Sequence, residues 1–131
     1  MKNKKQVLII DDDQSTRMLL GCLLSQKYDI ATQNNGLEAM AWLGKGNIPD
    51  VILLDVNMPR LNGPEFLQNI RTSGFYRDIP VIVVSGIERE KMMRRLYELG
   101  TNDFVRKPFK PNELFEKIEN VLTLLKPLHY E

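Results

Sequence analysis

Reactive or charged side chains directly follow four of the five short β-type runs in this sequence. They are Asp11, Asp12 and Asp13 after the first run, Asp55 after the third, Ser85 after the fourth, and Arg106 and Lys107 after the fifth. Taken singly, an aspartate in such a place often turns the chain, and a loop lysine is usually solvated. Their recurrence at the same end of four runs favours one shared pocket.

The aspartates would repel one another if folding brought them together. Two carboxylates about 4 Å apart repel by about 4 kcal/mol at an effective dielectric of about 20, so the cluster requires a cation or raised pKa values. Carboxylate oxygens suit Mg²⁺ or Mn²⁺. A cation, a carboxylate and a lysine together form a site for a phosphoryl group, at which the carboxylate attacks and the ammonium holds a phosphoryl oxygen.

The runs that would position these side chains alternate with helical patterns, five times over. Runs 7–10, 51–54 and 81–84 are continuously apolar, which is typical of strands buried on both faces of a parallel sheet. Runs 28–33 and 103–105 are shorter or more polar, so we expect them nearer the edges. Five such units predict a doubly wound α/β sandwich with right-handed crossovers, whose ligands bind at the carboxyl ends of the strands.

The helical patterns predict five helices between and after these strands. The first has an apolar stripe with Ser15 as its candidate N-cap, and Cys22 within it is expected to be a buried small hydrophobe. The stripe consists of Thr16, Leu19, Leu20, Leu23 and Leu24. The last helix is expected to close before Pro127. This predicts one domain over 1–125 and a short tail over 126–131.

Composition sets further limits. The chain has 131 residues, 18 basic and 17 acidic, with a formal charge of +1. This balance gives no electrostatic reason to expect nucleic acid or a membrane surface as a partner. One cysteine excludes an internal disulfide, and no apolar run approaches the roughly 20 residues needed to cross a bilayer. We therefore expect a cytoplasmic protein.

Four motifs, in this order and spacing, resemble the receiver domain of two-component response regulators. They are VLIIDDDQSTR, LLDVNMPRLNG, VIVVSG and DFVRKPF, and the likeness runs from about Val7 to Leu125. The second and fourth motifs are specific. The resemblance implies a flavodoxin-like (βα)5 fold with a five-stranded parallel sheet in the order 2-1-3-4-5.

The resemblance also implies a role for each matching residue of the acidic motifs. Asp55 would be the phosphoacceptor and a ligand of Mg²⁺ or Mn²⁺, and Asp12 would be a direct ligand of the same ion. Asp11 would support the metal through water, and Asn57 would be a metal ligand through its backbone carbonyl. Asp13 has no site role in this resemblance, so we expect it to serve the loop or the entry of the first helix.

The last two motifs would complete the site and carry the switch. Lys107 would pair with Asp55 and then with the phosphoryl group, and the Ser85 hydroxyl would bond a phosphoryl oxygen. Phe104 would be the switch aromatic. The Lys107–Pro108 bond is expected to be cis, a form tolerated essentially only before proline.

The implied function is signalling without substrate turnover. A histidine kinase or phosphotransfer protein would donate the phosphoryl group, and the domain would assist its own phosphorylation and dephosphorylation. The surface of the fourth helix, fifth strand and fifth helix would pass the signal to a downstream protein or a fused output domain. We expect a monomer or a phosphorylation-dependent dimer.

Two other functions are compatible with parts of the sequence. A phosphatase of the haloacid dehalogenase type also uses a strand-end aspartate, in a pattern like that of Asp11, Asp13 and Ser15, but it needs a further acidic pair after a later strand. A receiver-fold interaction module without phosphorylation is the other. Dinucleotide binding is not supported, because no Gly-rich loop follows the first run.

Overall fold

The computed structural model describes residues 4–56, 58, 60–86 and 90–128, with side chains up to residue 123. Five parallel strands form one sheet in the order β2-β1-β3-β4-β5. The strands are β1 (Gln6–Ile10), β2 (Asp29–Gln33), β3 (Val51–Leu54), β4 (Val81–Ser85) and β5 (Asp103–Arg106). The doubly wound sheet and its strand order are therefore confirmed.

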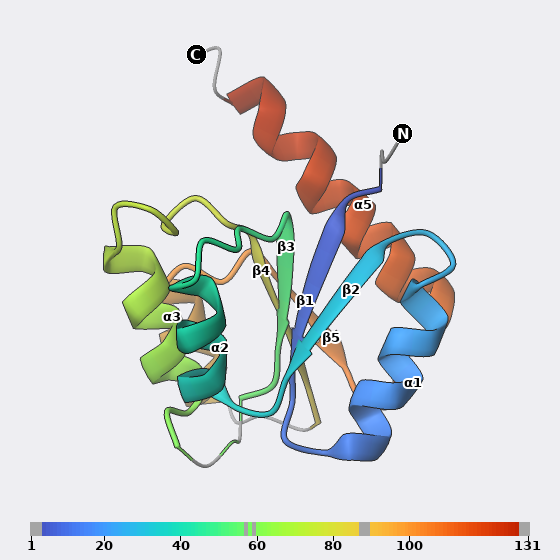
Figure 1. Cartoon of the computed structure of the whole chain (residues 1–131), viewed down its shortest axis with the longest axis horizontal. Helices are drawn as coiled ribbons and strands as arrows, with labels where there is room; N and C mark the ends of the chain where they lie inside the picture. Colours follow the sequence, from blue (N-terminus) through green and yellow to red (C-terminus); the bar gives the residue numbers. More distant parts are fainter. Residues whose placement is uncertain (1–3, 57, 59, 87–89, 129–131) are drawn as a thin grey trace.

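Helices cover both faces of this sheet. They are α1 (Gln14–Leu24), α2 (Gly36–Leu43), α3 (Gly63–Thr72), α4 (Glu90–Glu98) and α5 (Pro111–Leu128). Figure 1 shows α1 and α5 on one face, and α2 and α3 on the other. Leu96 of α4 belongs to the core cluster that α2 and α3 form with the sheet. The fold is thus a three-layer α/β/α sandwich.

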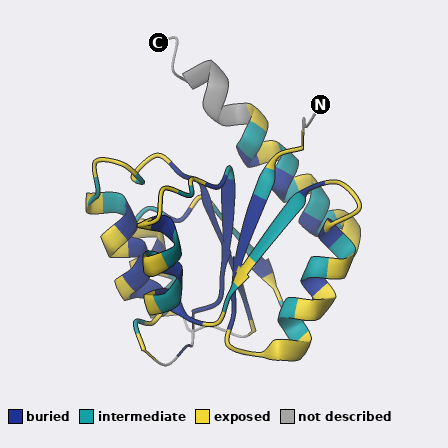
Figure 2. Cartoon of the chain, in the orientation of Figure 1, coloured by how far each residue is buried: buried dark blue, intermediate teal, exposed yellow. Residues whose placement is uncertain are grey.

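The central strands are buried as their sequences predict. Every residue of β3 and β4 is buried, as are Val7 to Ile10 of β1 (Figure 2). The edge strands β2 and β5 are mostly half-buried. The registers align Ile10 with Leu54, and Leu54 with Val83, so the carboxyl ends of the three central strands meet at one edge.

The first helix differs from its prediction in two respects. Its N-cap is Asp13 and not Ser15, because the Asp13 carboxylate accepts a hydrogen bond from the Thr16 amide at 2.9 Å. Cys22 is exposed and not buried. Leu20 and Leu24 face the sheet, and Cys22 lies about 200° around the helix from each at 100° per residue. Leu19, expected in the buried stripe, is likewise exposed.

The last helix is longer than its prediction. It extends to Leu128 and includes Pro127, whereas the sequence predicts an end before this proline. Proline removes one amide donor, but its fixed φ angle is compatible with helical backbone. Three residues assigned to the tail are therefore helical, and a domain boundary at residue 125 stays a prediction.

A guanidinium fastens α3 to the neighbouring turns. The Arg71 side chain donates five hydrogen bonds at 2.7–3.1 Å, to the backbone carbonyls of Arg77, Ile79 and Gly100 and to Asn102 Oδ1. These acceptors lie before β4 and in the turn between α4 and β5. One planar group therefore joins α3 to the segments that lead into the amino ends of β4 and β5.

We expect Arg71→Lys to lower the free energy of unfolding by about 2–4 kcal/mol, because one ammonium cannot satisfy carbonyls that a guanidinium fork reaches together. Urea unfolding followed by circular dichroism measures this loss. Arg94→Lys is the matched control, since Arg94 is exposed and its ion pair with Glu90 is long, at 3.6 Å. The control should stay within about 0.5 kcal/mol of wild type. Equal losses in the two variants would contradict a structural role for Arg71.

Candidate functional site

Asp11, the first residue after β1, is held through all four of its polar groups by partners from several elements. Its amide donates to the Gln33 carbonyl at 3.2 Å, and its own carbonyl accepts from Arg17 Nη1 at 2.7 Å. Its carboxylate accepts from the Asp13 amide on Oδ1 at 2.9 Å and from Lys107 Nζ on Oδ2 at 3.0 Å. Asp11 is buried. Its carboxylate is thus held in one orientation, with both oxygens engaged.

Asp13 turns away from this group. Its carboxylate accepts hydrogen bonds from the Thr16 amide at 2.9 Å and the Thr16 hydroxyl at 2.6 Å, and so caps α1. The prediction that Asp13 serves the entry of the helix is confirmed. The pairing of Asp11 with Asp13 that a phosphatase of the haloacid dehalogenase type would need is therefore not assembled.

Asp55 follows β3 and enters the same space from the middle of the sheet. Its amide donates to the Ile10 carbonyl at 2.9 Å, which sets it beside the end of β1. Its residue surface is only 8% exposed. Burial, together with the neighbouring charges of Asp11 and Asp12, raises the pKa of the Asp55 carboxyl to about 6, although Lys107 acts in the opposite direction. Asp55 is therefore mostly ionised at neutral pH, but a larger fraction of it is protonated than for an ordinary aspartate.

The backbone after Asp55 returns to the end of β3. The Gly63 amide donates to the Val56 carbonyl at 3.0 Å, and a Cβ atom on Gly63 would lie 2.8 Å from the Val56 Cα. Only glycine permits this close approach. Asn62 then caps α3 through a capping box with Glu65. The start of α3 is thus anchored against the strand that carries Asp55.

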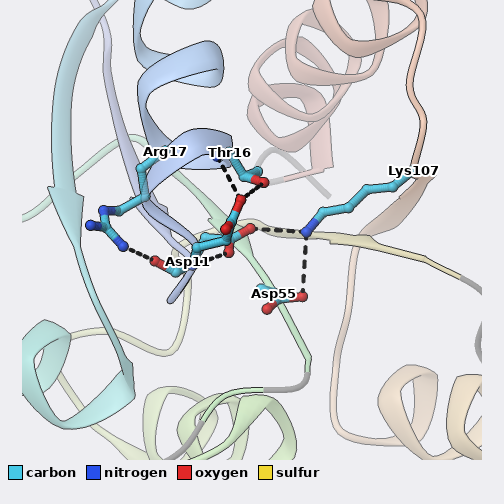
Figure 3. Close-up of polar contacts among 6 residues, drawn as sticks. Asp11, Thr16, Arg17, Asp55 and Lys107 are labelled. Atoms are coloured by element: carbon cyan, nitrogen blue, oxygen red, sulfur yellow. Dashed lines mark hydrogen bonds and ion pairs between the residues drawn. The ribbon is translucent and has the colours of Figure 1, made fainter.

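Lys107 reaches into the space between the two buried aspartates (Figure 3). Its Nζ lies 3.0 Å from Asp11 Oδ2 and 3.7 Å from Asp55 Oδ1. The expected pair with Asp55 is present, but the shorter contact is with Asp11. The Lys107 amide donates to the Ser85 carbonyl at 2.7 Å, and the Lys107–Pro108 bond is cis, as expected. The ammonium can therefore serve either carboxylate.

The three carboxylates form a group of the size that a cation needs. Asp11, Asp12 and Asp55 each offer one oxygen, and these oxygens lie within 4.8 Å of one another. Asp12 is exposed, and in the described part of the chain its carboxylate makes no hydrogen bond or ion pair. The Asp11 oxygens are engaged, so Asp12 and Asp55 have the oxygens that are more available to a hard cation. The donor set suits Mg²⁺, which is usually held by one or two carboxylates and water.

Ser85 ends β4 and is buried, and Phe104 in β5 is half-buried. Asn57 lies outside the described residues, so its carbonyl stays a prediction. Arg17 holds the Asp11 loop but was not predicted from the sequence, although it stands in the first motif, one turn into α1. The sequence feature that could have indicated this role is a basic residue six positions after Asp11.

The raised pKa of Asp55 predicts a pH dependence for cation binding. A protonated carboxyl is a poor metal ligand, so the affinity for Mg²⁺ should fall about tenfold per pH unit below about pH 6 and be nearly constant above about pH 7. Isothermal titration with MgCl₂ across this range measures it. In Asp55→Asn the step near pH 6 should disappear. A step that persists in this variant would assign it to another group.

In the described part of the chain, none of the helices has the length and apolar character required to cross a bilayer. The cytoplasmic location expected above stays a prediction.

Comparison with known proteins agrees with this geometry. The family model "Response regulator receiver domain" matches residues 7–119. The chain is 37% identical over 123 residues to the probable transcriptional regulator ycf27 of Guillardia theta, covering 93% of this chain and 47% of that protein. The Vibrio cholerae chemotaxis protein CheY4 is similar in structure, with a TM-score of 0.85 and 29% identity, covering 91% of this chain and 99% of that chain. The phosphorylated cyanobacterial phytochrome response regulator RcpA has a TM-score of 0.78 and 27% identity, with 91% of each chain covered.

The chain spans less than half of the length of the curated sequence relatives that it matches, among them ycf27. Receiver domains take phosphoryl groups from histidine kinases, bind Mg²⁺ at an acidic pocket and are generally non-catalytic signalling domains. They are often fused to output domains. The match over residues 7–119, the strand order and the aspartate cluster lead to one conclusion. This chain belongs to the response regulator receiver domain family of two-component signal transduction.

Proposed function

We propose that this chain accepts a phosphoryl group on Asp55 from a histidine kinase or phosphotransfer protein, in a reaction that requires Mg²⁺ or Mn²⁺. The observation that carries the proposal is the convergence of Asp55, Lys107 and the carboxylates of Asp11 and Asp12 at one sheet edge. A buried nucleophilic carboxylate, a lysine ammonium and an acidic metal site are the parts that phosphoryl transfer needs.

The transfer exchanges one bond for another at phosphorus. An Asp55 carboxylate oxygen attacks the phosphorus atom of a phosphohistidine, the phosphorus–nitrogen bond breaks, and the imidazole nitrogen leaves with the bonding electrons. Lys107 Nζ, 3.7 Å from Asp55 Oδ1, can move from its bond with Asp11 to a phosphoryl oxygen. When bound by Asp12 and Asp55, with Asp11 in support, a divalent cation supplies positive charge that reduces repulsion between carboxylate and phosphoryl oxygens.

The consequence of phosphorylation is a change of shape beside β4 and β5. Ser85 and Lys107 are adjacent through the bond between the Lys107 amide and the Ser85 carbonyl, so both can respond to a phosphoryl group on Asp55. The Ser85 hydroxyl would bond a phosphoryl oxygen, and Phe104 would change the position of its ring. The α4–β5–α5 surface would then have a different shape in the two states. A free-energy bias of a few kcal/mol between the states is enough to switch it.

The surface of α4, β5 and α5 would contact a downstream protein or a fused output domain, with the domain a monomer or a phosphorylation-dependent dimer.

The similarity to RcpA, which is described as phosphorylated, supports phosphorylation of this chain. The occurrence of relatives named as a hybrid histidine kinase and a sensor kinase supports a kinase as donor.

Incubation with acetyl phosphate, with and without Mg²⁺, tests the proposal by intact mass. Wild type with Mg²⁺ should gain the mass of one phosphoryl group, and neither Asp55→Ala nor metal-free wild type should do so. A gain that survives Asp55→Ala would refute the assignment of the acceptor. Turnover of a phosphomonoester that is lost in Asp11→Asn but kept in Asp55→Asn would instead favour a phosphatase.

A further inference from the structure

The ring of the proposed switch residue, Phe104, contacts a second aromatic ring, that of Tyr97. The ring of Phe104 in β5 packs against that of Tyr97 in α4 with centroids 4.9 Å apart and an interplanar angle of 64°, an edge-to-face contact. Tyr97 is 54% exposed, whereas Phe104 is half-buried. The Tyr97 ring therefore lies on the solvent side of the switch residue.

A small cavity lies beside Ser85, and Phe104 forms part of its wall. Its volume is about 30 Å³, and Met93, one turn before Tyr97 on α4, also lines it. This space has room for about one water molecule and is too small for a phenyl ring. In this state the Phe104 ring borders the cavity without filling it, so an inward movement requires the ring to leave Tyr97.

Packing decides where the Phe104 side chain rests, through its contacts with the Tyr97 ring and with the core cluster that includes Leu96. A phenylalanine has no hydroxyl, so no side-chain hydrogen bond can hold it at the surface. Edge-to-face pairs are favourable beyond the area they bury. The Tyr97 contact is thus a specific stabilisation of the outward position.

We infer that Tyr97 is a positioning residue that holds the Phe104 ring outside the Ser85 cavity and thereby opposes the phosphorylated state. The inference rests on the proposed function, because it concerns the switch that Asp55 phosphorylation would operate. Loss of the aromatic pair shifts the equilibrium between the two states by about two- to tenfold toward the inward state. The phosphoryl mimic would then bind more tightly by the same factor.

Beryllofluoride affinity in the presence of Mg²⁺ tests this inference, together with the NMR signals of ¹³C-labelled phenylalanine. Tyr97→Leu removes the ring from an exposed position and so should not impair folding, which thermal unfolding checks. Tyr97→Phe is the matched control because it keeps the ring. We expect Tyr97→Leu to bind beryllofluoride about two- to tenfold more tightly than wild type, with Tyr97→Phe unchanged. In the free protein, Tyr97→Leu should also move the Phe104 ring signal, which Phe104→Leu assigns.

The outcomes separate the inference from the function on which it rests. Equal or weaker affinity of Tyr97→Leu would overturn the role of Tyr97, and so would a Phe104 signal unchanged by this substitution. A wild-type protein that binds no beryllofluoride would overturn the proposed phosphorylation, and the inference with it. Tighter binding by Tyr97→Leu and by Tyr97→Phe alike would refute the aromatic pair as the cause.

Discussion

Asp55→Asn should reduce the rate of phosphoryl acceptance from acetyl phosphate by about 10³-fold or more, because it replaces the attacking oxygen with a neutral amide. Asp55 is nearly buried and is the carboxylate closest to the middle of the sheet edge, between the ends of β1 and β4. The rate of phosphoryl incorporation, followed by intact mass at saturating Mg²⁺, measures the loss.

Neighbouring aspartates provide graded controls for this prediction. Asp12→Asn removes a metal ligand and should weaken Mg²⁺ binding by about tenfold or more, and the loss of rate should be recovered in part at high Mg²⁺. Asp13→Asn should stay close to wild type, because asparagine also caps helices and Asp13 is bonded to Thr16 and not to the metal group. Equal losses at positions 12 and 13 would contradict the assignment of Asp12 to the metal and Asp13 to the helix cap.

Lys107→Met should lower the free energy of unfolding by about 2–3 kcal/mol at about pH 8 without divalent cation. The Asp11 side chain is 3% exposed and the Asp55 side chain 10% exposed, so the substitution leaves two buried carboxylates without their shared cation. Mg²⁺ should restore much of the stability because it supplies positive charge at the same place. Lower pH should do so too, since protonation of Asp55 removes the repulsion.

Asp55→Asn is the matched variant in this assay, and its effect should have the opposite sign. The pKa of Asp55 is raised in the folded protein from 3.8 to about 6, so the folded state binds a proton more tightly than the unfolded state. The stability that protonation provides is complete below about pH 3.8 and is lost as the pH rises through about 6. Asp55→Asn avoids that loss and should be more stable than wild type by about 1–2 kcal/mol at about pH 8. A stability lower than that of wild type would contradict the electrostatic account.

The sheet and the place of the site could be predicted from local patterns in the sequence. The continuous apolar runs at 51–54 and 81–84 have one structural explanation in an alternating α/β chain, and both are central strands. Parallel strands bring their carboxyl ends to one edge, so a group following each run had to converge with the others. This is why Asp11, Asp55 and Lys107 could be placed together from their positions along the chain alone.

The details that could not be predicted from the sequence depend on side-chain packing and on helical phase. Lys107 Nζ lies closer to Asp11 than to Asp55. No local sequence pattern encodes which of two carboxylates a long side chain approaches more closely. Cys22 stands among leucines, but its position around α1 turns it to solvent. The contact of Tyr97 with Phe104 joins residues of different elements through the tertiary fold.

The location of the phosphoryl group is the most direct test of the account. Borohydride reduces an aspartyl phosphate to homoserine, so protein treated with acetyl phosphate and Mg²⁺ can be reduced, digested with trypsin and analysed by tandem mass spectrometry. Peptide 46–60 contains Asp55, and peptide 6–17 contains Asp11, Asp12 and Asp13. The account predicts homoserine at position 55, formed only when Mg²⁺ is present. Homoserine in peptide 6–17, or none in either peptide, would contradict it.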